Sequence, residues 1–95
     1  MENHTEDAAI LLSLSDEMTR LMDTEAFKTG VTLVKARIFT EWASTKRTDV
    51  VEREALHSEQ RALERLLESF THIIGEGLVA REAIRRQEQE DTSLS

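Results

Sequence analysis

The spacing of Glu54 and His57 is the feature of this sequence that comes nearest to a chemical motif. Three residues apart on a helix, a carboxylate and an imidazole share one face, as in the Glu-x-x-His ligands of di-iron carboxylate bundles. Glu41, on the far side of a short polar connection, could supply a second carboxylate. Such ligands must point into a bundle interior, and an Arg/Glu-rich helix produces this spacing by chance. We therefore favour a surface histidine with a carboxylate neighbour, and we predict no metal and no cofactor.

Other catalytic arrangements are missing. The chain has no cysteine, which excludes a thiolate nucleophile and a disulfide framework. It has no glycine-rich phosphate loop and no serine on a strand-turn-helix elbow. His72 occupies the polar position between Phe70 and Ile73 and is expected to point outward, without a catalytic partner. The sequence predicts that the protein is not an enzyme.

Charge is distributed unevenly along the chain. Residues 27–49 carry +3, whereas residues 1–26 carry −6 and the whole chain −7. The basic cluster consists of Lys28, Lys35, Arg37, Lys46 and Arg47, with Phe39 and Trp42 among them as aromatic groups on which bases could stack. The cluster carries few charges and the protein is acidic, so we interpret it as a solvated helix face and expect no nucleic-acid binding.

The composition favours helices in one small domain. The 95 residues include no proline, no tyrosine and three glycines, and they are 39% hydrophobic and 33% charged. No apolar run approaches the roughly 18 residues that a membrane span needs. The acidic start of the chain is unlike a secretory signal, so we expect a cytoplasmic protein that does not enter a membrane.

Apolar periodicity predicts three helices, at about residues 7–22, 24–44 and 49–74, within a single helical domain at 7–77. Thr24 is expected to cap the second helix, which places the break before Gly30 in preference to a break at Gly30 itself. Asp49 with Glu52 resembles a capping box at the start of the third helix. Gly75 and Gly77 are expected to end it.

The two ends of the chain carry weaker patterns. Residues 1–6 are expected to form a flexible acidic N-terminus. Residues 78–95 are expected to be weakly helical at first and then, from Gln87 onward, a disordered polar tail.

The second and third helices are expected to form an antiparallel hairpin, because their connection is short. Their apolar stripe and expected interaction core consists of Phe27, Val31, Val34, Ile38, Trp42, Leu56, Leu63, Leu66, Phe70 and Ile73. Two helices cannot cover stripes this broad, and we expect parts of Leu33, Ile38, Leu66 and Ile73 to stay open. The first helix, a second copy of the chain or another protein must cover them. The fold prediction is therefore an all-α hairpin with an additional N-terminal helix, assembled as a helical-bundle oligomer with a dimer favoured.

One family shares a pattern with the hairpin. The matching residues are Phe27, Glu41-Trp42-Ala43-Ser44-Thr45, Thr48-Asp49, Arg53-Glu54-Ala55-Leu56, Arg61-Ala62-Leu63 and Ile74-Gly75-Glu76-Gly77. Over residues 24–77 the chain resembles small helical-hairpin proteins of tailed bacteriophages. The resemblance implies a phage protein in the host cytoplasm, with a place among virion-assembly components, and it supplies no catalytic residues.

Three hypotheses for function follow. The first is a non-enzymatic phage accessory or assembly protein that binds itself, and another phage or host protein, through the hairpin. The second is an acidic inhibitor whose carboxylates imitate DNA in the basic groove of a host nucleic-acid-binding enzyme. The third is a di-iron bundle built on Glu41, Glu54 and His57.

Overall fold

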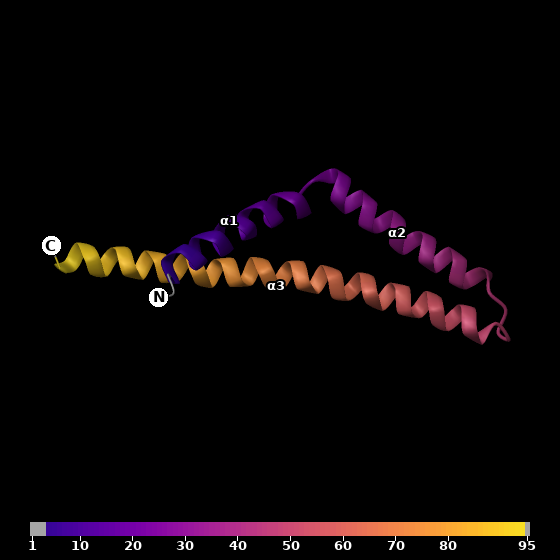
Figure 1. The fold of residues 1–95 in the computed structure, drawn as a ribbon. Coiled ribbons are helices and arrows are strands. Elements are labelled where there is room, and N and C mark those ends of the chain that lie inside the picture. Colours follow the sequence, from indigo (N-terminus) through magenta and orange to yellow (C-terminus); the bar gives the residue numbers. More distant parts are fainter. Residues whose placement is uncertain (1–3, 95) are drawn as a thin grey trace. The chain divides into compact units, whose positions relative to one another are not determined.

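A computed structural model describes residues 4–94 of the protein and shows three helices there and no strand. They are α1 (His4–Met22), α2 (Glu25–Ser44) and α3 (Val50–Leu94) (Figure 1). The predicted all-α class is confirmed. The helices group into two compact units, of which unit 2 is Met22–Ser69 and unit 1 joins the residues up to Leu21 with those from Phe70 onward.

The start of α2 is set by the threonine that the sequence indicated. Thr24 has extended backbone angles, and its hydroxyl accepts a hydrogen bond from the Phe27 amide at 3.1 Å. That bond satisfies one of the amides that a helix leaves without a partner in its first turn. The helix then runs through Gly30 to Ser44, so the earlier of the two predicted breaks is confirmed.

The connection between α2 and α3 is a short turn whose hydrogen bonds are local. The Thr45 amide donates to the Trp42 carbonyl at 3.1 Å, which closes α2. Asp49 precedes α3 as predicted, and its carboxylate accepts from the Lys46 amide at 3.1 Å. Its backbone carbonyl receives the Arg53 amide at 3.0 Å, the first helical bond of α3. The aspartate side chain therefore binds the turn that precedes the helix and not an amide of the first helical turn, so the predicted capping box is wrong.

The predicted end of the third helix was wrong. Instead of stopping at residue 74, α3 continues through Gly75 and Gly77 to Leu94. Neither glycine adopts the positive φ of a helix C-cap. The helical cost of glycine is about 1 kcal/mol each, and the good helix formers that follow can offset it. Their side chains also support the helix, since Arg85 pairs with Glu82 at 2.7 Å across one turn.

Part of each end that was predicted to be flexible is helical in the structure. Residues 4–6 belong to α1, while residues 1–3 of the predicted N-terminus lie outside the described residues. The polar stretch from Gln87, expected to be disordered, is helical as far as Leu94. There the Thr92 hydroxyl donates to the Glu88 carbonyl at 2.9 Å, one turn earlier.

Burial is sparse in both units. In unit 2 the buried side chains are Ile38 on α2 and Leu56 on α3, which are 3% and 6% exposed. In unit 1 they are Ser15 on α1 and Ala80 on α3, which are 4% and 6% exposed. Ile38 was expected to stay partly open, and its burial corrects that expectation. None of the helices that the structure describes has the length and apolar character needed to cross a bilayer.

Candidate functional site

The three residues considered as metal ligands are not brought together. Glu41, Glu54 and His57 are all exposed, the first on α2 and the others on α3. Between residues 4 and 94 no group of three or more histidine, aspartate or glutamate side chains could hold a metal ion. The Glu-x-x-His spacing is present on the helix without an interior site for it to line.

The basic cluster also remains dispersed over exposed positions. Lys28 forms an ion pair with Asp23 at 3.3 Å, so part of its charge is balanced within the chain. Lys35, Arg37, Lys46 and Arg47 are all exposed. His72 points outward as predicted, with 76% of its side chain exposed and Glu76 at 2.8 Å, a pair that is ionic when the histidine is protonated.

The predicted core stripe is divided between the two units. Ile38 and Leu56 are buried, Phe27, Val31, Leu63, Phe70 and Ile73 are half-buried, and Val34, Trp42 and Leu66 are exposed. Phe70 and Ile73 belong to unit 1 and the other eight residues to unit 2. The inward face of unit 2 thus has a buried centre at Ile38 and Leu56, and its flanks are open to solvent.

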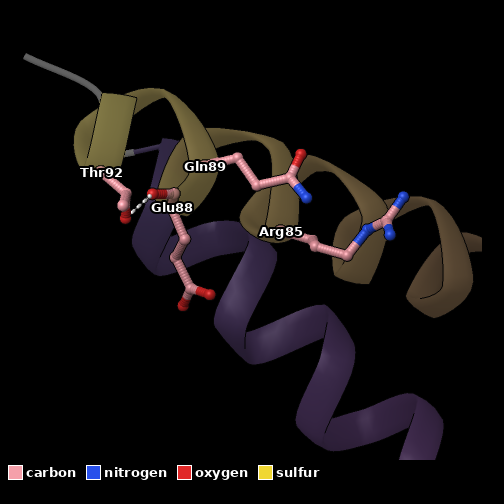
Figure 2. Close-up of a pocket in the computed structure, with 4 residues that line it drawn as sticks. All are labelled: Arg85, Glu88, Gln89 and Thr92. Atoms are coloured by element: carbon pink, nitrogen blue, oxygen red, sulfur yellow. Dashed lines mark hydrogen bonds between the residues drawn. The ribbon is translucent and has the colours of Figure 1, made fainter. Parts of the chain in front are cut away.

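Among the described residues, those that line a hollow near the C-terminus of α3 all come from that helix. They are Arg85, Glu88, Gln89 and Thr92 (Figure 2). In Figure 2 the Thr92 hydroxyl is hydrogen-bonded to the Glu88 backbone. A polar lining from a single helix offers little enclosure, so we do not regard this hollow as a ligand site.

A second hollow, in unit 2, has walls from two helices. We call it the Phe39 cleft; it measures about 260 Å³, and its lining residues are Ile38, Phe39, Trp42, Leu56, His57 and Gln60. Its floor is the buried pair Ile38 and Leu56. Its rim includes Phe39, which is 67% exposed, and Trp42, which is 40% exposed.

The tryptophan wall of this cleft is held in place by a cation. The guanidinium carbon of Arg53 lies 4.3 Å from the centre of the Trp42 ring, a cation–π arrangement. The lining offers apolar contact, one imidazole and one amide, with no carboxylate or hydroxyl to act on them. The arrangement is suited to holding an apolar group rather than to performing a reaction.

Sequence periodicity identified part of the cleft and missed the rest. Ile38, Trp42 and Leu56 belong to the predicted stripe, whereas the sequence indicates Phe39 only as a stacking group and gives no prediction for Gln60. The feature of the sequence that points to Phe39 and Gln60 is their spacing from a buried residue. Phe39 follows Ile38 by one residue, and Gln60 is one helical turn after Leu56, so both flank the buried face.

Comparison of the chain with models of known protein families, with curated proteins and with solved structures finds no match. The inferences about function therefore depend on the sequence and on the geometry within each unit.

Proposed function

We propose that this chain is a non-enzymatic protein–protein interaction module that self-associates through a helical hairpin formed by α2 and the first part of α3. The observation that supports this proposal most strongly is the imbalance between buried and exposed apolar side chains. Among the described residues no side chain is less than 2% exposed. A second copy of unit 2 would bury the open flanks and complete a four-helix bundle.

Association would also bury apolar side chains that one copy leaves in water. Phe39 and Leu66 are 67% and 51% exposed, and removing such side chains from water is favourable.

The cellular context that we propose comes from the phage resemblance. We infer an accessory or assembly protein of a tailed bacteriophage that acts in the host cytoplasm or in the virion. Its first partner is a second copy of itself, and another phage or host protein would bind the surface that remains.

The acidic-inhibitor hypothesis receives less support. A DNA mimic presents unpaired carboxylates to a basic groove. In unit 1, however, Asp16 pairs with Arg81 at 3.0 Å. Glu82 pairs with Arg85 at 2.7 Å and lies 3.4 Å from Arg86. These cations of the same chain neutralise part of the acidic surface, so it imitates a phosphate backbone poorly.

Sedimentation equilibrium at micromolar protein concentrations and moderate salt tests the proposal. We expect an average mass that rises above the 10.9 kDa of one chain as the concentration increases. One species at 10.9 kDa across the whole range would overturn self-association. Circular dichroism of the same samples must show helix, so that an unfolded chain is not mistaken for a folded monomer.

A further inference from the structure

The Phe39 cleft in unit 2 places a protruding aromatic ring directly beside a hole. Phe39 is 67% exposed, although a phenyl ring gains free energy when it leaves water. The hole next to it measures about 260 Å³ and has Ile38 and Leu56 as its floor. The same surface patch therefore contains a protruding side chain, the Phe39 ring, and a recess of apolar lining beside it, which we call the knob and the hole.

The hole is formed before any partner binds. Ile38 on α2 and Leu56 on α3 are both buried and both line the hole, and the Arg53 guanidinium carbon lies 4.3 Å from the Trp42 ring centre on one wall. A stacked indole keeps fewer rotamers than a free one, so less conformational entropy is lost when the cleft is filled. Preformed apolar clefts with an aromatic wall are characteristic of interface hot spots.

We propose that the Phe39 cleft is the centre of a two-fold interface between two copies of this chain, in which Phe39 of each copy inserts into the cleft of the other. The proposal rests on the self-association proposed above and adds the surface and the anchoring residue. A two-fold contact uses the same patch on both partners, so the patch must be complementary to itself. A knob beside a hole meets that requirement.

The size of the hole fits a phenyl ring. A dry apolar cavity of about 150 Å³ is large enough to bind benzene. The cleft, at about 260 Å³, has room for the ring and for the methylene that carries it. The apolar hole therefore matches the group that stands exposed at its own rim.

Unit 2 carries charges of opposite sign on the side of the cleft. Lys35 lies one helical turn before Phe39 on α2, and Glu64 lies two turns after His57 on α3, so helical spacing places both on the side of the cleft. Both are exposed. In the proposed dimer, with α2 of one copy crossing α3 of the other, Lys35 would pair with Glu64 of the second copy in the polar rim of the interface.

The other exposed apolar side chains of unit 2 lack this combination. Leu33 is 64% exposed, but it lies on the side of α2 opposite Ile38. It lines neither the Phe39 cleft nor the hollows at the start and near the C-terminus of α3. The hollow at the start of α3 is lined by Thr48, Asp49, Val50, Val51, Glu52 and Ala55, so it has apolar side chains but neither an aromatic wall nor a buried floor. Of these two hollows of unit 2, the Phe39 cleft is the one that combines a buried apolar floor with aromatic side chains at its rim.

Two matched substitutions on α2 test the interface. Phe39→Ala and Leu33→Ala each truncate a large apolar side chain that is more than 60% exposed in one chain, so both variants should fold. We expect Phe39→Ala to weaken the dimer about 30-fold or more, as truncation of an interface hot spot does. Leu33→Ala should change the dissociation constant less than about threefold, because a residue outside the anchor is nearly neutral. Sedimentation equilibrium of the full chain measures all three proteins.

Cross-linking provides a second readout, because the natural chain has no cysteine. Gln60→Cys places a thiol in the lining of the cleft, and Ala36→Cys places one on the outer side of α2. A short bismaleimide should join two copies of the Gln60→Cys variant and leave the Ala36→Cys variant as single chains. Repeating the reaction on diluted protein distinguishes cross-links formed within dimers from those formed by random collisions between chains.

The outcomes separate this proposal from the more general one. A folded wild-type chain that remains a monomer overturns both. A wild-type dimer that Phe39→Ala does not weaken more than Leu33→Ala overturns the cleft interface and leaves self-association standing. Selective weakening by Phe39→Ala together with cross-linking at position 60 supports the cleft. Cross-linking at position 36 alone would place the interface on the outer side of α2 and overturn the cleft.

Discussion

Gly77 of α3 lies directly against the side chain of Ser15 of α1 in unit 1. A Cβ at position 77 would collide with both the Cβ and the Oγ of Ser15, and it would also lie 3.4 Å from the Leu11 carbonyl oxygen. Nearby, the Ser15 hydroxyl donates to the Ile74 carbonyl at 3.2 Å. The glycine thus allows the backbones of two helices to approach each other closely.

Gly77→Ala should therefore destabilise the protein, although alanine is the better helix former. The methyl group has no space beside Ser15, and overpacking of this kind costs about 1–3 kcal/mol. We expect a lower melting temperature by circular dichroism at a fixed protein concentration. Gly75→Ala is the matched control, because nothing lies within 4 Å of a Cβ added there. That variant should gain up to about 1 kcal/mol from helix propensity. Stabilisation of both variants would contradict the close contact.

Acid should remove one local stabilising contribution from α3. Arg85 donates a hydrogen bond to Glu82 at 2.7 Å, and with the charge of Arg86 it holds the pKa of the Glu82 carboxyl below its ordinary value of 4.5. A carboxyl whose pKa is lower in the folded chain stabilises that chain above pH 4.5 and loses the contribution as the pH falls through the folded value. Glu82→Gln should therefore lower the melting temperature slightly near pH 7.

The difference between wild type and Glu82→Gln should disappear as the pH falls below 4.5, and it should shrink in high salt because the groups are exposed. The control is the same substitution in an Arg85→Gln background, where most of the interaction is already absent. A difference in melting temperature that stays constant from neutral to acidic pH would show that ion pairing at Glu82 does not contribute.

Local chemistry made the helix starts predictable. Thr24 caps α2 through its own hydroxyl, and Asp49 precedes α3, so in each case one residue and its immediate neighbours determine the boundary. The burial of Leu56 follows from the apolar stripe in the same way. Nothing distant in the sequence is needed for these features, and the periodic pattern is sufficient to identify them.

The role of Gly77 depends on a residue far away in the sequence. A glycine can terminate a helix by adopting positive φ or can permit close packing within a helix, and the two roles look the same in a single sequence. Gly77 has the second role, because it lies against Ser15 on another helix. The Phe39 cleft escaped prediction for a related reason, because periodicity identifies the face that packs and not the groove along its flank.

Two aliphatic residues of α2 should differ sharply in their contribution to stability. Ile38 is 3% exposed against α3, whereas Leu33 on the same helix is 64% exposed. Ile38→Ala should lower the free energy of unfolding by about 2–5 kcal/mol, since it leaves a cavity beside Leu56. Leu33→Ala should change it by about 0.5 kcal/mol or less. Urea unfolding at one protein concentration measures both, and equal losses would mean that Leu33 is also buried in the assembled protein.

The intrinsic fluorescence of the protein should report directly on the Phe39 cleft. Trp42 is the single tryptophan and the chain has no tyrosine, so the emission comes from one wall of the cleft. In one chain Trp42 is 40% exposed, and filling the cleft would remove water from its ring. We expect the emission maximum to move to longer wavelength as the protein is diluted and the dimer dissociates. Phe39→Ala should show the long-wavelength emission already at concentrations where the wild type is a dimer. If sedimentation showed a dimer while the emission of wild-type protein did not change on dilution, the interface would lie away from Trp42.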